Sequence, residues 1–150
     1  MTDTLMTAGA NATGTATDED ATRAAAELVE KFLTASMIPD PETAATFMAD
    51  DVDITVTGGR AFKHPGEASA FNAGRYAWVK KQMDRFDVCP GTDETIVYSF
   101  GTLYGAWPDG TPFEGNRYVD RFVVKGGKIV KMDVWNDSAE RILTARGIEA

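Results

Sequence analysis

Apolar residues recur at steps of three and four along the first part of the chain, which is the spacing of an amphipathic helix. Asp18-Glu19-Asp20 precedes them and marks the helix start, because acidic side chains are favourable at the positive end of a helix dipole. The helix is predicted to end near Ile38, where Pro39-Asp40-Pro41 follows. Its apolar face consists of Ala25, Leu28, Val29, Phe32 and Leu33.

Two further helices are predicted before the main strands begin. Pro41 suits the first turn of a short helix over residues 42–48. A third helix is expected from about residue 65 to residue 83, because apolar side chains fall on overlapping helical faces there. Those side chains are Ala68, Phe71, Tyr76, Val79 and Met83, with Trp78 adding bulk.

Alternation of apolar and polar residues predicts strands in the rest of the chain. Pro108-Asp109-Gly110 and Gly126-Gly127 are turn signals between the later strands. Strands are expected over residues 52–56, 85–88, 95–107, 116–125 and 128–136, and a final helix over 138–145. Helices followed by consecutive strands indicate an α+β fold rather than alternating βαβ units.

Length and composition fit a single folded domain. The chain has 150 residues, of which 43% are hydrophobic and 10% aromatic, which is enough to build a core. Residues 1–17 are rich in Thr, Ala and Gly and lack Lys, Arg and any continuous apolar stretch, so they are interpreted as a flexible tail and not as a secretory signal. The domain is assigned to residues 18–150.

Charge and residue counts weigh against several function classes. The formal net charge of −8 disfavours nucleic acid and anionic membrane surfaces as partners. No stretch approaches the roughly 18 apolar residues that span a membrane, and a cytoplasmic location is expected. With one cysteine, one histidine and no glycine motif for phosphate, neither a metal nor a cofactor is predicted.

Three segments, at 47–52, 120–129 and 133–137, carry a resemblance to a known group of proteins. Through them the chain resembles the nuclear transport factor 2-like superfamily over roughly residues 18–146, and within it the SnoaL-like domains. The resemblance implies a curved mixed or antiparallel sheet, wrapped by three to four helices around a cone-shaped pocket. It also implies a homodimer formed through the outer face of the sheet.

By this resemblance, alternate residues of the last two long strands point into the pocket. The inward set is Tyr118, Asp120, Phe122, Met132, Val134 and Asn136. The outward set is Arg121, Val123, Asp133 and Trp135. An outward tryptophan is a suitable anchor for a dimer contact, because aromatic residues are enriched at the centres of interfaces.

Two activities of the superfamily need side chains that this chain lacks. Ketosteroid isomerases use a carboxylate on the first strand, a tyrosine on the first helix and a protonated aspartate on the penultimate strand. The last of these matches Asp120, but the tyrosine and carboxylate positions hold Phe32 and Val56. SnoaL-type cyclases use an aspartate and often a histidine on the last strand, where this chain has Val134 and Met132. The first mechanism is excluded and the second is weakened.

Asp120 and His64 are the candidate catalytic residues. Burial in an apolar cone would raise the pKa of Asp120, so that it could act as a general acid or hydrogen-bond donor. The alternative is a structural aspartate bonded to a neighbouring group. His64 lies beside Lys63 where the cone should open, and it is either an acid/base group or an exposed loop residue.

Polar groups on the predicted third helix complete the expected pocket. Asn72, Arg75 and Tyr76 share one side of that helix and either line the pocket or form a surface stripe. The predicted ligand-binding set is Phe32, Val56, Asn72, Tyr76, Tyr118, Phe122, Met132, Val134 and Asn136. The expected function is binding of a small apolar or polycyclic molecule, with cofactor-free proton transfer of isomerase, dehydratase or cyclase type if the protein is an enzyme. The alternative is a non-catalytic ligand-binding or dimerisation module of the same fold.

Overall fold

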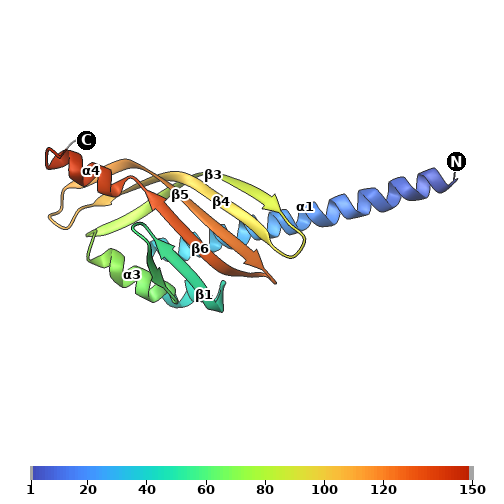
Figure 1. Ribbon diagram of the computed structural model, residues 1–150, viewed down its shortest axis with the longest axis horizontal. Helices are drawn as coiled ribbons and strands as arrows, with labels where there is room; N and C mark the ends of the chain where they lie inside the picture. The colour runs from blue at the N-terminus through green and yellow to red at the C-terminus, as the bar shows by residue number, and fades with distance from the viewer. Residues whose placement is uncertain (1, 149–150) are drawn as a thin grey trace.

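The computed structural model describes residues 2–148, with side chains described from residue 19 onward. Within this part of the chain there are four helices, and Figure 1 shows the N-terminal part of the longest one projecting away from the rest of the molecule. The helices are α1 (Thr2–Met37), α2 (Pro41–Ala45), α3 (Pro65–Ala73) and α4 (Ser138–Ala145).

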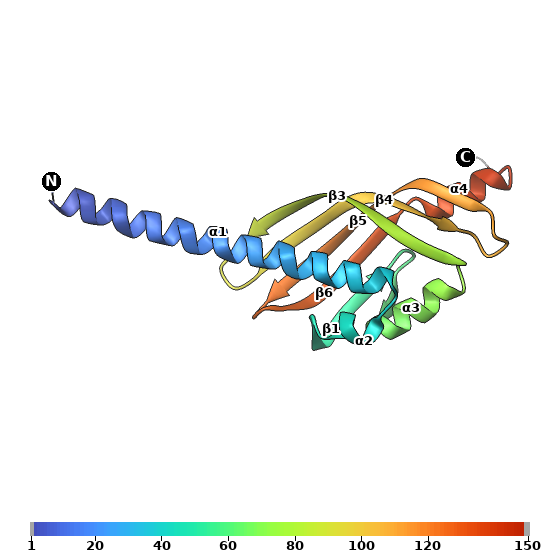
Figure 2. The ribbon, with the colours of Figure 1, turned by 180° about the vertical axis from the view of Figure 1, so that it is seen from behind.

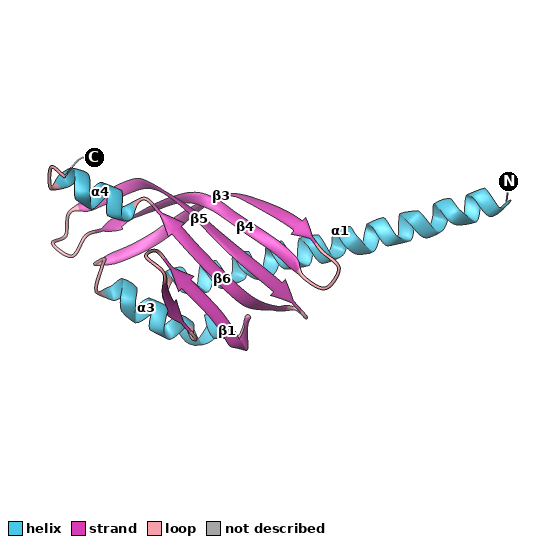
Figure 3. Ribbon diagram, in the orientation of Figure 1, coloured by secondary structure: helices cyan, strands magenta, loops and turns pink. Residues whose placement is uncertain are grey.

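Six strands form one curved sheet in the order β2-β1-β6-β5-β4-β3. Their bounds are Met48–Val56 for β1, Arg60–Phe62 for β2, Trp78–Pro90 for β3, Thr95–Ala106 for β4, Pro112–Lys125 for β5 and Lys128–Asn136 for β6. The β1–β6 pair is parallel and the other pairs are antiparallel, so the sheet is mixed, as expected. The α+β architecture predicted from the pattern of the chain is confirmed (Figure 3).

One face of the sheet is covered by α1, with α2 and α3 beside its lower edge, as Figure 2 shows. The apolar face of α1 supplies the contact: Val29 and Leu33 are buried, and Phe32 meets Phe122 of β5 edge to face at a centroid distance of 5.8 Å. Ile54 of β1 is buried in the same core. The residues predicted for the inner side of the first helix therefore do pack inward.

The register of the last strands sets the predicted inward residues in rows. Tyr118, Asp120 and Phe122 of β5 stand opposite Asn136, Val134 and Met132 of β6, respectively. Asp120 is 0% exposed, whereas Trp135, on the opposite face of β6, is 50% exposed. The Asp120 carboxyl group is therefore on the face of the sheet that α1 covers.

The main differences from the prediction lie in three elements; in addition, α2 ends at Ala45, so the predicted second helix over 42–48 is too long, and β1 begins at Met48 instead of 52. The third helix ends at Ala73 with Gly74 as its C-cap, and the chain from Trp78 onward is strand β3, so the predicted helix over 74–83 is wrong. The short strand β2 was not predicted, because three residues carry too little alternation. Helix α1 begins at Thr2 and not at Asp18. The flexibility expected for residues 1–17 stays a prediction.

Candidate functional site

A pocket of about 140 Å³ lies between the inner face of the sheet and the helices. Its body is apolar, with walls from α1, α2, β1, α3 and the inner residues of β3 to β6. The apolar lining includes Phe32, Leu33, Met37, Ile54, Val56, Phe71, Val79, Leu103, Met132 and Val134. A chamber of this kind favours a ligand with apolar surface, because burying that surface removes it from water.

The structure brings most of the predicted ligand-binding residues together at this pocket. The predicted residues that line it are Phe32, Val56, Asn72, Tyr76, Tyr118, Met132, Val134 and Asn136. Phe122 does not line it, since its ring is 0% exposed and packs against Phe32 in the core. Neither candidate catalytic residue, Asp120 or His64, is among the lining residues.

Asp120 lies directly behind a lysine that does line the pocket. The Lys81 Nζ of β3 forms a hydrogen-bonded ion pair with Asp120 Oδ2, and the side chains of the two residues are 18% and 0% exposed. Asp120 Oδ1 is buried and has no hydrogen-bond partner among the described residues. The Lys81 ammonium group therefore lies at the pocket, and the Asp120 carboxyl group contacts it from the side away from the pocket.

Tyr118 lies beside Lys81 and lines the same part of the pocket, which is called the floor below. The Lys81 Nζ lies 4.5 Å from the centroid of the Tyr118 ring, a cation–π arrangement, and the Tyr118 hydroxyl is 2.9 Å from Ser99 Oγ. Ser99 is directly opposite Asp120 in the β4–β5 register. These four residues, Lys81, Ser99, Tyr118 and Asp120, are referred to below as the floor cluster.

Gly101 makes the floor cluster possible. It lies on the inner face of β4 between Ser99 and Leu103, and a Cβ atom there would stand 2.8 Å from Cε2 of Tyr118 and 1.9 Å from the backbone oxygen of Gln82. No side chain fits at this position. The missing side chain leaves the space in which the Tyr118 ring lies against β4.

Burial dominates the electrostatics of the floor cluster. It raises the pKa of the Asp120 carboxyl above the usual 3.8, and the Lys81 charge and hydrogen bond oppose that rise. Desolvation likewise raises the pKa of Tyr118 to about 12, against the hydrogen bond with Ser99. Tyr118 is therefore a neutral hydrogen-bonding group at physiological pH.

His64 faces its own helix. It is the N-cap of α3, and its Nδ1 accepts a hydrogen bond of 2.9 Å from the backbone N–H of Gly66. This occupies one ring nitrogen in holding the first turn of the helix. The acid/base role expected for His64 stays a prediction, and the placement of its ring outside the pocket lining does not favour it.

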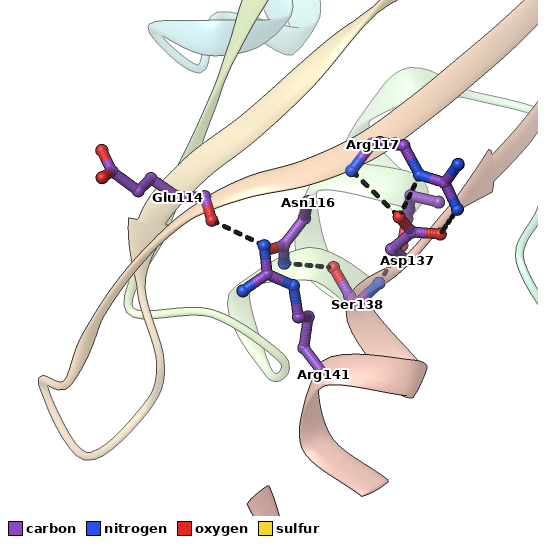
Figure 4. Close-up of polar contacts among 7 residues, drawn as sticks. Glu114, Asn116, Arg117, Asp137, Ser138 and Arg141 are labelled. Atoms are coloured by element: carbon purple, nitrogen blue, oxygen red, sulfur yellow. Dashed lines mark hydrogen bonds and ion pairs between the residues drawn. The ribbon is translucent and has the colours of Figure 1, made fainter. Parts of the chain in front are cut away.

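A second buried polar cluster anchors the far end of the pocket. The Tyr76 hydroxyl donates to Ser138 Oγ at 2.8 Å, and Asn116 Nδ2 donates to the same oxygen at 3.3 Å. Asn136 Oδ1 accepts the N–H of Ser138 at 3.0 Å. Figure 4 shows Asn116 and Ser138 at the start of α4, beside the Arg117–Asp137 ion pair. The Tyr76 hydroxyl and the Asn136 oxygen are thereby engaged within the protein.

The sequence prediction missed Lys81, because it placed residues 74–83 on a helix. The signal was present: Val79, Lys81 and Met83 alternate with exposed neighbours and are half-buried positions of β3. Read with a period of two, this segment puts a lysine between two apolar residues on an inner face.

The structure offers no preformed metal centre in the part of the chain whose residues it describes, since no group of three His, Cys, Asp or Glu side chains converges there. Among the described helices, none is long and apolar enough to cross a membrane. The polar groups that line the pocket offer chemistry of their own. An ammonium held against a buried carboxylate can donate a proton or stabilise a developing oxyanion.

Comparison with known proteins gives matches of structure and not of sequence. No protein-family model and no curated protein matches the chain. An NTF2-like protein of unknown function from Burkholderia pseudomallei K96243 has 21% identity and a TM-score of 0.63, covering 83% of this chain and 96% of its own.

Two other solved structures resemble the chain equally well. The hexachlorocyclohexane dehydrochlorinase LinA-type3 from Novosphingobium barchaimii LL02 has a TM-score of 0.68 at 18% identity, covering 80% of this chain and 89% of its own. A putative SnoaL-like polyketide cyclase from Jannaschia sp. CCS1 has a TM-score of 0.62 at 17% identity, covering 81% and 90%. Together with the mixed sheet and the helices on one face, these matches identify the fold of this chain as nuclear transport factor 2-like.

Proposed function

We propose that the protein binds a small, largely apolar molecule in this pocket and catalyses a cofactor-free proton transfer on it, of isomerase, dehydratase or cyclase type. The observation that carries the proposal is the Lys81–Asp120 ion pair at the floor of an apolar chamber. Charged groups withdrawn from water interact strongly with a reacting centre, because little solvent screens them. Similar folds include a dehydrochlorinase and a putative cyclase, which is consistent with such chemistry.

In this proposal Lys81 is the group that meets the substrate. Its ammonium donates a proton to, or hydrogen-bonds, the oxygen on which negative charge develops, and the resulting amine regains a proton from the substrate or from water. Asp120 does not line the pocket, so it acts as a positioning residue that fixes the Lys81 side chain. Tyr118, beside Lys81, supplies a neutral polar edge to the same floor.

One observation favours a second candidate function, a non-catalytic ligand-binding module. No aspartate, glutamate or histidine is among the residues that line the pocket, so no conventional general base faces a ligand there. Under this alternative the floor cluster orients a ligand by hydrogen bonding alone. Turnover, and not binding, separates the two candidates.

The experiment is a turnover assay by NMR on a panel of cyclic hydroxy-ketones and epoxides, with Asp120→Asn as the test variant. We expect Asp120→Asn to retain ligand affinity and to lose at least about a hundredfold in kcat. The matched control is Asp133→Asn, which removes a carboxylate that pairs with Lys131 and Arg121 on the opposite face of the sheet. Binding that persists in the wild-type protein without turnover of any panel member would establish the non-catalytic module instead.

We further propose that the outer face of the sheet forms a homodimer in the cytoplasm. Phe100, Val119 and Trp135 stand in register across β4, β5 and β6 on that face. The exposed Trp78 and Tyr104 add a second aromatic contact at 5.9 Å. An aromatic-rich face of this kind is typical of protein interfaces. The expectation that neither nucleic acid nor membrane is a partner stays a prediction.

A further inference from the structure

The rim of the pocket differs in character from its interior. Of the lining residues, three are exposed, namely Asn72, Arg75 and Lys80. All three belong to the short stretch that joins the end of α3 to the start of β3. The pocket therefore opens to solvent at this junction, and a bound molecule would place its outermost group beside these side chains.

The charge of the lining is one-sided. The lining residues include three cations, Arg75, Lys80 and Lys81, and no carboxylate, in a chain that has 23 acidic and 15 basic residues. The Lys81 charge is matched by Asp120 beneath it. The charges of the two rim cations have no such partner: among the side chains that the structure describes, no carboxylate forms an ion pair with Arg75 or Lys80.

Arg75 is the better placed of the two rim cations. Its guanidinium lies over the Phe71 ring at 4.5 Å, and Phe71 itself lines the pocket. Stacking restricts the arginine to the rim and leaves the N–H groups at the edge of its plane available. Lys80 alternates with the inward Val79 and Lys81 along β3, so its side chain is directed mainly outward.

The charged groups of the lining are all donors. Asn136 Oδ1, a lining acceptor, is already used, because it accepts from the Ser138 backbone N–H at 3.0 Å. The guanidinium of Arg75 and the ammonium of Lys80 form no ion pair among the described side chains and are available to a ligand. Recognition by such a lining requires an acceptor-rich group, and guanidinium geometry matches a carboxylate in particular.

The size of the cavity limits the apolar part of the ligand. Its volume is about 140 Å³. A dry protein cavity of about 150 Å³ accommodates a benzene molecule. The enclosed part of the ligand is therefore about one six-membered ring, and any further group lies at the rim.

From these observations we propose that the pocket takes a monocyclic carboxylate, with the ring in the apolar chamber and the carboxylate bound by Arg75 at the rim. This inference rests on the ligand-binding part of the proposed function and adds the chemical class of the ligand. It does not depend on turnover, since an anion of this kind is equally a substrate for an enzyme or a ligand for a binding module.

The test compares benzoate with benzamide, which has the same ring and a neutral amide in place of the carboxylate. Both are titrated into the full chain at pH 7 and low salt, with the methyl signals of the pocket residue Met132 followed by NMR. We expect benzoate to bind about tenfold more tightly than benzamide, because hydrogen bonds between charged groups are stronger than neutral ones. Added salt should reduce this preference.

Arg75→Leu should abolish the preference for benzoate, and Arg75→Gln serves as a second variant that keeps a polar side chain. Arg85→Leu is the matched control, because Arg85 is also exposed and stacked on a phenylalanine, Phe100 at 4.3 Å, but does not line the pocket. Equal affinity for benzoate and benzamide, or equal effects of the two leucine variants, overturns the carboxylate assignment while the turnover assay on neutral substrates still decides the proposed function. Failure of both probes to bind also overturns it.

Discussion

Lys81 on β3 contacts Asp120 on β5 across the intervening strand β4, on the face of the sheet that the helices cover. The two residues are 39 positions apart in sequence, and β4 between them carries Gly101, where a Cβ atom would collide with the Gln82 backbone and the Tyr118 ring. The pair joins an edge strand to a central strand. The pair supplies the charged group of the proposed chemistry. It also lowers the free energy of unfolding, because moving each charge out of bulk water costs solvation energy.

Removal of one member of this pair should be costly. Lys81→Met leaves the fully buried carboxyl group of Asp120 without its counter-charge, and we expect a loss of about 3 kcal/mol in the free energy of unfolding at pH 7. Lys131→Met, which breaks a partly exposed pair with Asp133 and leaves Arg121 beside that carboxylate, should cost less than about 1 kcal/mol. Urea unfolding measures both. Equal losses in the two variants would contradict the structural role of the buried pair.

The free energy of unfolding should depend on pH through the Asp120 carboxyl group. Its pKa is raised in the folded state above the ordinary value of 3.8, so the native state binds more protons than the unfolded state once the pH exceeds that value. This contribution to stability is complete below pH 3.8 and is lost as the pH rises through the folded pKa. Measured by urea unfolding, the wild type should therefore lose stability relative to Asp120→Asn as the pH rises.

Gly101→Ala should disturb the site and the fold together. The added Cβ would stand 1.9 Å from the Gln82 backbone oxygen, so β3 must move away from β4, at a cost of about 2 kcal/mol or more. Gly74→Ala is the control, since its Cβ would meet nothing closer than 3.6 Å, and it should leave stability unchanged or slightly higher. Thermal unfolding followed by circular dichroism compares the two. A Gly101→Ala protein as stable as the control would show that the strands tolerate the clash.

Substitutions of His64 should separate a role as the N-cap of α3 from a role in acid/base catalysis. His64→Ala removes the acceptor for the Gly66 N–H, and we expect a loss of about 1 kcal/mol in stability with unchanged ligand affinity and kcat. His64→Asn should restore the cap, because asparagine is a preferred N-cap residue. A large fall in kcat in both variants, with stability intact in the asparagine variant, would instead assign His64 an acid/base role.

Dimerisation through the outer face should depend on Trp135, whose side chain is half exposed. Trp135→Asp places a charge in the centre of the proposed contact and should shift the protein from dimer to monomer in sedimentation velocity experiments. Ile142→Asp on α4 alters another exposed apolar residue away from this face and should leave the dimer intact. A wild-type protein that stays monomeric at all concentrations tested would remove the proposal.

The fold followed from local pattern wherever one period was unambiguous. Residues 128–136 and 138–145 were predicted with the bounds that the structure shows, because a glycine pair and a capping residue delimit them. The stretch 74–83 was misassigned, since Tyr76, Val79 and Met83 satisfy helical spacing while Val79, Lys81 and Met83 satisfy strand spacing. Tertiary pairing with β4 decides between the two periods, and a single sequence does not contain that information.

The same error limited the prediction of the site. Asp120 was identified because it matches the penultimate-strand aspartate of ketosteroid isomerases, and the resemblance placed it with Tyr118 and Phe122 on the inward strand face. Its partner Lys81 was missed, and so was the outcome that Asp120 lies behind the pocket lining. The β1–β6 pairing is parallel and joins residues far apart in the chain, so the closure of the pocket on that side follows from the assembled sheet and not from any local signal.

Strand β3 is an edge of the sheet, and no other strand among residues 2–148 lies beside its outer hydrogen-bonding groups. At Lys81 the backbone N–H instead donates to Met37 Sδ at the end of α1, at 3.1 Å. The helix thus occupies the place where an extended segment of another chain could add to the sheet. Loosening the last turn of α1 would open this border to intermolecular strand addition, so the residues that enclose the pocket also protect the protein against aggregation.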